Sequence, residues 1–416
     1  MKPLPTLLSV IGLGLVTHRL IAAESSGAPG NLEAAARAVN ALGADLLVHG
    51  PATDANALLS PYSIQTALAM SFAGAAGDTR AEMAKVLHYV GDEAGLHRSF
   101  AALRQAIEEV TGGKEDPGRP VTLTVANRLF GQTGYAFRAP FLDLLKHTSG
   151  APFQPMDFVR EAAGATQEIN AWVEEQTRRR IRDLVPPDTL DASTRLVLVN
   201  AVYLKAPWAE EFPAQNTKPR PFHIGGGPVV EAPTMLRQDY FGHARREGFS
   251  AVTLPYRGGE IQFLVLLPHE TNGLAAVEAS LTPELLASCV RLRLTEVILY
   301  LPKLRLELPV LRLGKVLQSL GMKSAFDQPR GTANFERMAP RKPNDYPYIS
   351  EVFHQTFLAL DEKGTEAAAA TAAEVLPGSN VGSQPVELRV DHPFLFAIQH
   401  RSSGACLFLG RITDPR

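Results

Sequence analysis

The run Thr194–Trp208, TRLVLVNAVYLKAPW, is the feature of the sequence that most restricts the fold. Successive side chains of an extended backbone point to opposite faces, and both faces of this run are apolar. A strand of this kind belongs in the middle of a sheet, with other elements packed on both of its sides. Asn200 interrupts the run, and a buried amide at that position needs hydrogen-bond partners.

The regions on either side of this run have different patterns. In residues 31–50 the apolar side chains recur at steps of three and four, which indicates one face of a helix. Ser60 and Pro61 fit the N-cap and first position of a buried helix, and residues 96–110 and 165–176 are amphipathic helices. Beyond residue 193 strands dominate, at 251–256, 261–268, 297–308, 353–361, 386–390, 393–400 and 405–412. Helices gathered early and strands gathered late predict one large α+β domain over residues 24–416.

The N-terminus is predicted to be an export signal. Lys2 precedes an uncharged apolar run from Leu4 to Thr17, which is too short to cross a membrane. Ala22 and Ala23 offer a cleavage point, so residues 1–23 are interpreted as a signal peptide. The chain contains no Asn-x-Ser/Thr sequon and is rich in alanine, and we therefore expect a prokaryotic protein that is secreted, either extracellular or periplasmic.

Composition and motifs argue against several classes of function. The net charge of −2 gives no general attraction to nucleic acid, and the sequence shows no membrane-spanning candidate. Catalytic, nucleotide-binding and metal-binding signatures are missing, which predicts a protein that is not an enzyme, takes no cofactor and binds no metal. The basic run Thr177–Arg182 fits a solvated helix end better than an anion site. Cys289 and Cys406 do not form a disulfide framework, although the sequence leaves a bridge between them open.

The segment Glu362–Val375, EKGTEAAAATAAEV, has two possible interpretations. Its alanines favour an exposed helix or a loop by propensity alone. At strand period, Thr365, Ala367, Ala369, Thr371 and Ala373 share one face, while both glutamates after Gly364 fall on the other. A strand with such an uncharged face could enter an existing sheet without a clash, and Gly364 supplies backbone freedom at its start.

Several stretches of the chain resemble the serpin family. DEKGTEAAAAT, at residues 361–371, resembles the hinge of the serpin reactive-centre loop, and residues 386–415 are similar to the family's C-terminal signature with its DHPFLF and FLGRITDP. Residues 56–83, 169–185, 196–212, 301–307 and 320–327 also match. The likeness covers residues 31–415. It implies the serpin fold, with three β-sheets, eight to nine helices and an exposed loop over about residues 363–390.

The resemblance implies an inhibitor of serine proteases, with cysteine proteases as a further possibility. In inhibitory serpins a protease cuts the exposed loop, the loop inserts into the central sheet as a new strand, and the acyl-enzyme is trapped. The hinge residues carried over are Glu362, Gly364, Thr365, Glu366, Ala367, Ala369 and Thr371. A bulky or charged residue on the buried face would stall insertion, and Gly364–Ala373 holds none there, which favours an inhibitor over a non-inhibitory serpin that binds or chaperones other molecules.

In the serpin family the reactive bond usually lies sixteen residues beyond the hinge glutamate, so the resemblance implies a bond at Gly378–Ser379, counted from Glu362. Leu376 would fill a protease pocket better, but Pro377 follows it, and Asn380 or Val381 would correspond to a longer loop. Glycine at the bond implies a target that accepts small residues, such as an elastase-like or subtilisin-like enzyme. We expect a monomeric inhibitor that forms a covalent complex with this protease.

The resemblance also assigns roles to six residues outside the hinge. Ser60, Ser63, Asn200 and His354 match a polar cluster that controls opening of the central sheet. Lys303 matches the partner of Glu362 in an ion pair where the loop enters, and Trp208 matches an aromatic residue at the same entrance. A satisfied buried polar pair, an ordinary surface ion pair and a plain core tryptophan are the simpler explanations of these residues.

Overall fold

The structure is a computed structural model, and it describes residues 31–50, 54–111, 121–148, 153–225, 227–366 and 384–416. The described residues form nine α-helices and two β-sheets, in agreement with the predicted α+β class. The α-helices are α1 (Leu32–His49), α2 (Pro61–Gly74), α3 (Gly77–Val86), α4 (Glu93–Val110), α5 (Ala139–Thr148), α6 (Phe158–Gln176), α7 (Leu274–Ala279), α8 (Pro283–Ser288) and α9 (Gly314–Ser319). The predicted signal peptide lies outside the described residues.

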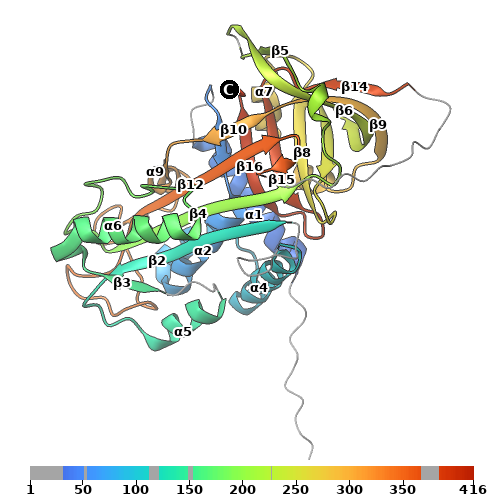
Figure 1. The fold of residues 1–416 in the computed structure, drawn as a ribbon. Coiled ribbons are helices and arrows are strands. Elements are labelled where there is room, and N and C mark those ends of the chain that lie inside the picture. The colour runs from blue at the N-terminus through green and yellow to red at the C-terminus, as the bar shows by residue number, and fades with distance from the viewer. Residues whose placement is uncertain (1–30, 51–53, 112–120, 149–152, 226, 367–383) are drawn as a thin grey trace, which may run out of the picture.

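The first sheet crosses the middle of the molecule (Figure 1). Its described strands run in the order β10-β12-β13-β4-β2-β3, and β11 pairs with β12. Their bounds are β2 (Thr122–Gln132), β3 (Gln154–Met156), β4 (Leu196–Pro207), β10 (Leu304–Glu307), β11 (Leu311–Arg312), β12 (Ile349–Asp361) and β13 (Gly364–Thr365). We call this the central sheet. The sequence analysis did not identify β2, which pairs along ten residues of β4.

The prediction for the apolar run is confirmed, because β4 is covered on both faces. On one side, Val197 and Val199 pack with Ile169 and Val173 of α6. On the other side, Leu198 lies in a cluster with the buried helix α2. Figure 1 shows α6 in front of the central sheet and α2 behind it. The side chain of Ser60 accepts a hydrogen bond from the backbone of Ser63, so it is the N-cap of α2 as predicted.

The second sheet joins β1-β16-β15-β8-β7-β6-β9-β14, with β5 paired to β6, among the described residues. Its strands are β1 (Ala57–Leu59), β5 (Lys218–His223), β6 (Val229–Arg245), β7 (Phe249–Pro255), β8 (Ile261–Pro268), β9 (Leu294–Pro302), β14 (Val386–Arg389), β15 (Phe394–His400) and β16 (Cys406–Ile412). The resemblance implied three sheets, and the described residues form two. The long strand β6 explains the difference, because it pairs first with β9 and then with β7, so hydrogen bonding continues from one part to the other.

Two further findings correct or complete the sequence analysis. The apolar run at residues 297–308 was expected to be one strand, but β9 and β10 belong to different sheets and Lys303 lies between them. Pro302 cannot donate a hydrogen bond, which suits a strand end. Cys289 and Cys406 are both free and buried.

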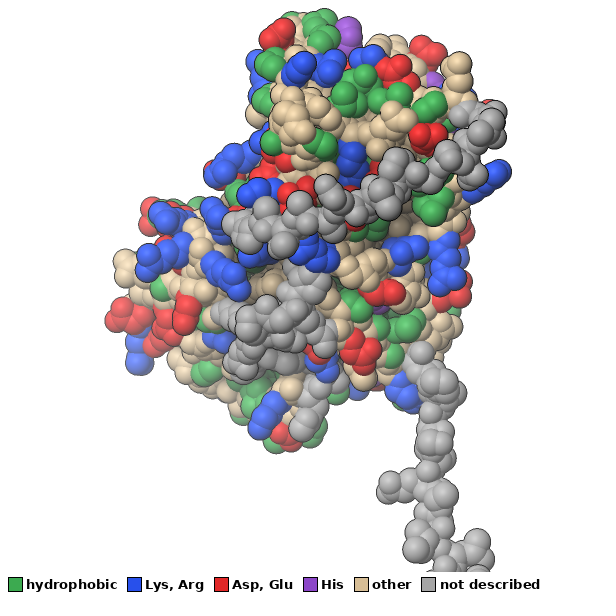
Figure 2. Space-filling view, turned by 45° about the vertical axis from the view of Figure 1, so that its right-hand side comes forward, with side chains coloured by type: hydrophobic (Ala, Val, Ile, Leu, Met, Phe, Trp, Pro, Cys, Tyr) green, Lys and Arg blue, Asp and Glu red, His purple; other side chains and the backbone are tan. Residues whose placement is uncertain are grey.

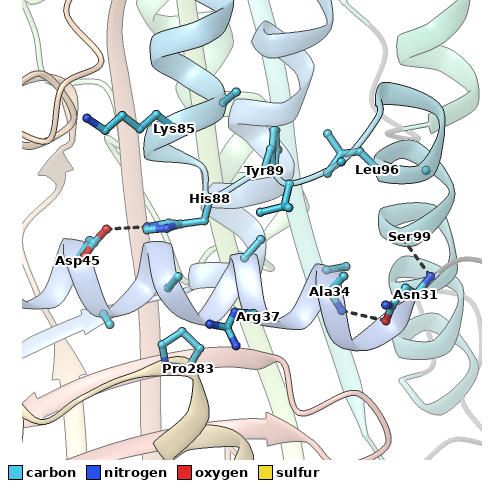
Figure 3. Close-up of a pocket in the computed structure, with 18 of the residues that line it drawn as sticks. Asn31, Ala34, Arg37, Asp45, Lys85, His88, Tyr89, Leu96, Ser99 and Pro283 are labelled. Atoms are coloured by element: carbon cyan, nitrogen blue, oxygen red, sulfur yellow. Dashed lines mark hydrogen bonds and ion pairs between the residues drawn. The ribbon is translucent and has the colours of Figure 1, made fainter.

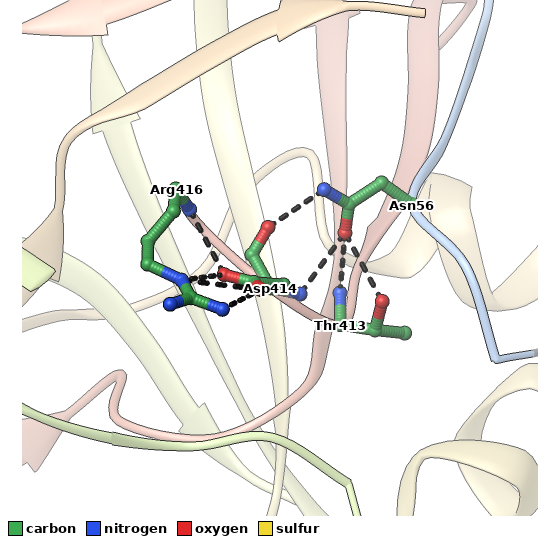
Figure 4. Close-up of polar contacts among 4 residues, drawn as sticks. All are labelled: Asn56, Thr413, Asp414 and Arg416. Atoms are coloured by element: carbon green, nitrogen blue, oxygen red, sulfur yellow. Dashed lines mark hydrogen bonds and ion pairs between the residues drawn. The ribbon is translucent and has the colours of Figure 1, made fainter. Parts of the chain in front are cut away.

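The C-terminal residues are joined to the segment before β1 by one amide. The Asn56 side chain accepts hydrogen bonds from the backbone N–H groups of Thr413 and Asp414, at 2.7 and 3.1 Å, and donates to the Asp414 carbonyl (Figure 4). This contact fixes the residues after β16 beside the start of β1. No helix among the described residues is long and apolar enough to cross a membrane.

Candidate functional site

The hinge enters the central sheet at one end. β4 and β12 pair directly in parallel from Leu196 to Tyr203, and beyond that point the two strands separate. The short strand β13 lies between them, with Thr365 opposite Leu360 of β12 and Ala206 of β4. Gly364 and Thr365 of the predicted hinge are therefore already part of the sheet.

Gly364 has a backbone that an ordinary residue could not adopt without strain. Its φ is +139°, and a Cβ atom there would lie 2.2 Å from the carbonyl oxygen of Ala206. The chain leaves β12 at Asp361, turns, and re-enters beside the same strand, and this tight return needs a residue without a side chain.

Thr365 is completely buried and points into the molecule. Its hydroxyl lies 2.6 Å from the hydroxyl of Tyr256, and these two groups satisfy each other by a hydrogen bond. Burial raises the pKa of Tyr256 well above its ordinary range, so the phenol stays neutral. The sequence analysis did not identify Tyr256.

Trp208 closes the same entrance. Its indole ring stacks on Tyr256 with 4.5 Å between ring centroids, and it is 1 % exposed. Its Nε1 donates a 2.9 Å hydrogen bond to the carbonyl of Asp361, and its backbone N–H donates to the carbonyl of Lys363. Trp208 thus binds the turn that leads into the hinge, which a tryptophan buried only for its area would not do.

Glu362 forms the ion pair that the sequence analysis predicted. Lys303 Nζ donates to Glu362 Oε2 at 2.8 Å, and Thr217 donates to Oε1 at 2.8 Å. Although burial alone raises it, these hydrogen bonds hold the pKa of the Glu362 carboxyl below its ordinary value. Lys303 is brought here because it lies between β9 and β10, where the two sheets meet.

A polar cluster lies deeper, where β4 and β12 still pair. His354 and Asn200 are opposite each other, and both are fully buried. His354 Nδ1 donates to Asn200 Oδ1, while the backbone N–H of Ser60 donates to His354 Nε2 at 3.1 Å. Burial lowers the pKa of His354 to about 3, so the imidazole is neutral.

Asn127 of β2 completes this cluster, and the sequence analysis did not identify it. The Asn200 amide donates to Ser63 Oγ and to Asn127 Oδ1, and Ser63 Oγ donates to Asn127 Oδ1 at 3.0 Å. The side chain of Asn127 also donates to the Ser63 carbonyl. Three strands and the start of α2 therefore meet in one hydrogen-bond network. The sequence did contain a signal for Asn127, because it is a polar residue within the alternating stretch TLTVANRLF.

The remaining predicted site residues lie outside the described residues: Ala367, Ala369 and Thr371 of the hinge and the reactive bond Gly378–Ser379. Glu366, at the end of the described hinge, makes an ion pair with Arg180. This contact changes the interpretation of the basic run Thr177–Arg182. Its arginines follow the end of α6 as predicted, but one of them binds the hinge.

A separate cavity of about 990 Å³ lies between α1, α4 and the segment that joins α3 to α4 (Figure 3). Its polar contacts include His88 with Asp45 at 2.7 Å and Asn31 with Ser99 at 3.0 Å. Small alanines of α1 line much of it. This cavity shows no hydroxyl or thiol hydrogen-bonded to its histidine, and the described residues contain no group of three or more metal-ligating side chains.

Comparison with known proteins agrees with this architecture. The family model described as "Serpin (serine protease inhibitor)" matches residues 37–415, and the chain belongs to the serpin family. Serpins are protease inhibitors and not enzymes, in agreement with the sequence analysis. The family is therefore established for nearly the whole described chain.

Particular relatives can be named. The chain is 37% identical to a leukocyte elastase inhibitor of Bos taurus over 379 residues, which cover 89% of this chain and 95% of the relative. It is 36% identical to an uncharacterised serpin-like protein of Thermococcus kodakarensis, and the matched residues cover 91% of this chain and 85% of that relative. Among solved structures, Serpin48 of Tenebrio molitor is 31% identical with a TM-score of 0.78, covering 92% of this chain and 98% of that one. Uncleaved ovalbumin is 28% identical with a TM-score of 0.79, and the match covers 93% of this chain and 100% of the ovalbumin chain.

Proposed function

We propose that this serpin is an irreversible inhibitor that traps serine proteases by inserting its cleaved loop between β4 and β12. The observation that carries the proposal is the position of β13. Gly364 and Thr365 already occupy the end of the gap between these strands, in antiparallel register with both. A cleaved loop could therefore extend a strand that has already begun.

The register of β13 predicts where the rest of the hinge would go. Each step of two residues along the loop moves two residues back along β4 and β12. Ala367 would then lie between Leu204 and Leu358, and Ala369 between Val202 and Thr356. Leu204, Val202 and Leu358 are buried in the core beneath the sheet. Small uncharged side chains fit these positions, which supports an inhibitory hinge.

Insertion has to break the direct pairing of β4 with β12. The inserted strand replaces it with two new ladders, so the cleaved protein gains hydrogen bonds that the intact chain cannot form. The intact state is then kinetically trapped, and the energy released on insertion drives translocation. Fifteen inserted residues would carry a tethered protease about 50 Å.

For the target, we propose a serine protease that accepts small residues, of the elastase or subtilisin type, at Gly378–Ser379. A relative that is 37% identical carries the name leukocyte elastase inhibitor, which supports an elastase-type target. We also propose that the protein is exported, on the basis of its N-terminal apolar run, and that it acts as a monomer.

The test is a covalent complex that survives denaturing electrophoresis. Incubation with pancreatic elastase and with subtilisin should give a band at the summed mass of inhibitor and protease. Mass spectrometry of the released C-terminal fragment should show a fragment that begins at Ser379. A fragment that begins elsewhere would move the reactive bond and leave the mechanism in place.

Thr365→Arg separates inhibition from simple cleavage. Arginine cannot occupy the fully buried position of Thr365, so insertion should stop and the acyl-enzyme should hydrolyse. We expect a folded protein that is cleaved without forming a complex. Thr365→Ser keeps the hydroxyl and the size, and should form the complex as the unmodified chain does. Cleavage without any complex across a broad panel of proteases would favour a binding or chaperone role instead.

A further inference from the structure

The two cysteines of the chain lie where the short helix α8 meets the second sheet, and the proposed inhibitory mechanism uses neither. Cys289 is the C-cap of α8, and Cys406 is the first residue of β16. Both side chains are 0 % exposed and belong to the same apolar cluster. Figure 2 shows an outer face of the molecule, on which Lys and Arg are intermingled with Asp and Glu. The two nucleophilic sulfurs are instead held in the apolar interior.

Two buried glutamines hold the end of α8 against the second sheet beside Cys406. Gln399 of β15 is paired with Cys406 across the strands, and its amide donates a 2.9 Å hydrogen bond to the Leu286 carbonyl of α8. Gln262 of β8 donates to the Cys289 carbonyl at 3.2 Å and to the Gln399 side-chain oxygen at 3.0 Å. Side chains of directly paired residues lie on the same face of a sheet. Gln399 therefore lies beside Cys406 and contacts the last turn of α8, which brings the two cysteines together.

The surroundings of the two thiols differ, and the difference decides which of them reacts first. Burial raises the pKa of Cys406 to about 12; the hydrogen bond to Gln399 acts in the opposite direction, and the neighbouring Cys289 raises it further. Burial also raises the pKa of Cys289, but Ser288 and the charge of Arg246 act in the opposite direction. Arg246 donates a 3.2 Å hydrogen bond to the hydroxyl of Ser288, which is exposed. Cys289 is therefore the thiol nearer to solvent and to a positive charge.

We propose that Cys289 and Cys406 close into a disulfide bond, which fastens α8 to β16, when the chain meets a disulfide oxidant. The Cys289 thiolate attacks the oxidant's disulfide and releases one thiol, and the Cys406 thiolate then attacks Cys289 Sγ and releases the second. Two protein thiols are thereby oxidised to one disulfide and the oxidant is reduced to two thiols, so hydrogen atoms and electrons balance. Because both sulfurs are buried, the reaction takes place during folding or on local opening of α8.

The bond stabilises the protein and keeps its two parts together after cleavage. It closes the long loop from residue 289 to residue 406, and the unfolded chain loses more freedom when a longer loop is closed. The predicted reactive bond Gly378–Ser379 lies within that loop, so a C-terminal fragment cut there stays covalently attached. Both cysteines lie at the second sheet, whereas the proposed insertion separates strands of the central sheet. The proposal goes beyond the inhibitory function and does not rest on it.

The first test is whether the bond forms. The full chain is produced once in the oxidising periplasm and once in the reducing cytoplasm of a bacterial host, and is digested without reductant. Mass spectrometry of the periplasmic protein should show two peptides joined through Cys289 and Cys406, and iodoacetamide should label neither cysteine after denaturation. The cytoplasmic protein should show two reactive thiols. Cys406→Ala should leave one reactive thiol in either compartment. Two reactive thiols in the periplasmic protein would overturn the proposal.

The second test is whether the fold aligns the two thiols. The protein is equilibrated with mixtures of reduced and oxidised glutathione, in buffer and in denaturing urea, and the bridged fraction is measured by iodoacetamide labelling. The equilibrium constant for bridging should be about a hundredfold or more higher in the folded protein, and the thermal unfolding midpoint of the bridged form should be about 5 °C higher than that of the reduced form. Cys289→Ala cannot form the bridge, so its midpoint should not respond to oxidant. Equal equilibrium constants in buffer and in urea would show that the fold does not align the pair.

Cleavage at the predicted reactive bond separates this proposal from the inhibitory function. After the bridged protein is cut there, the C-terminal fragment should stay attached on a denaturing gel without reductant and should separate when reductant is added. Trapping of a protease should be equal in the bridged and reduced forms, because the bond lies outside the central sheet. Separation of the fragment without reductant would overturn the disulfide. A retained fragment in a protein that never traps a protease would overturn the inhibitory function and leave the disulfide standing.

Discussion

The hydroxyl of Tyr256 lies 2.6 Å from the hydroxyl of Thr365, and this contact ties the hinge to the second sheet. Tyr256 follows β7 and forms a bridge with Trp208, the residue after β4. The residues that follow β7 and β4 thus build the entrance together. The hinge is held by packing and hydrogen bonding beneath the sheet, and by Arg180 above it.

Tyr256→Phe should weaken the hold on the hinge. The Thr365 hydroxyl would lose its partner while still buried, which costs about 1–2 kcal/mol. We expect a lower midpoint of urea unfolding and increased hydrogen exchange at Thr365. Tyr240→Phe, at an exposed tyrosine, should change neither quantity. An unaltered midpoint in Tyr256→Phe would show that the contact does not stabilise the hinge.

Glu362→Gln should weaken the turn that precedes the hinge. The Lys303 side chain is partly exposed, so we expect a loss of about 1 kcal/mol or less in unfolding free energy. Because the folded pKa of Glu362 is lowered, its contribution is present above the ordinary carboxylate pKa and is lost as pH falls through the folded value. The difference between the variant and the unmodified chain should therefore shrink under acid. A difference that grows as pH falls would contradict the assignment.

His354 should make the protein less stable as pH falls below about 6.5. The imidazole titrates near 6.5 when unfolded but at about 3 when folded, so the unfolded chain binds more protons between these values. The unfolding free energy should decrease by as much as about 1.4 kcal/mol per pH unit in that window. Thermal melts from pH 7 to pH 4 would measure this slope. In His354→Gln the slope should be smaller, whatever the absolute stability of the variant.

Thr371→Val should affect the cleaved protein and not the intact one. Under the proposed mechanism, continuation of the β13 register would put Thr371 of the inserted loop between Asn200 and His354, and insertion would break the hydrogen bond between these two side chains. The threonine hydroxyl would replace the lost partner, and valine could not. We expect an unchanged melting temperature before cleavage and a loss of about 1–2 kcal/mol after it. Thr371→Ser keeps the hydroxyl and serves as the control, with little loss expected after cleavage.

Cleavage of the loop should raise the melting temperature well above that of the intact protein. Under the proposed mechanism the inserted strand would replace the one ladder between β4 and β12 by two and would bury further side chains. Limited proteolysis followed by calorimetry would measure the change, and Thr365→Arg should show little or none of it. Equal melting temperatures before and after cleavage of the unmodified chain would remove the claim of a metastable native state.

Sequence patterns predicted the local features well where neighbouring residues decide them. The apolar run of β4, the N-cap at Ser60 and the overall α+β class follow from side-chain period and backbone chemistry, and each is present in the structure. The split of residues 297–308 into β9 and β10 was not predicted, because one apolar run looks the same whether it stays in one sheet or passes to another.

The amino-acid sequence by itself determined which residues could be placed in a central sheet and which loop could enter it. Its small, uncharged face from Thr365 to Ala373 is a local property that needs no partner to be recognised. Tertiary structure decided what holds the hinge: Tyr256 below, Arg180 above and Asn127 in the deeper cluster. These contacts join residues 73 to 186 positions apart in the chain. Periodicity carries no information over such separations, because only the folded sheets bring those side chains within hydrogen-bond distance.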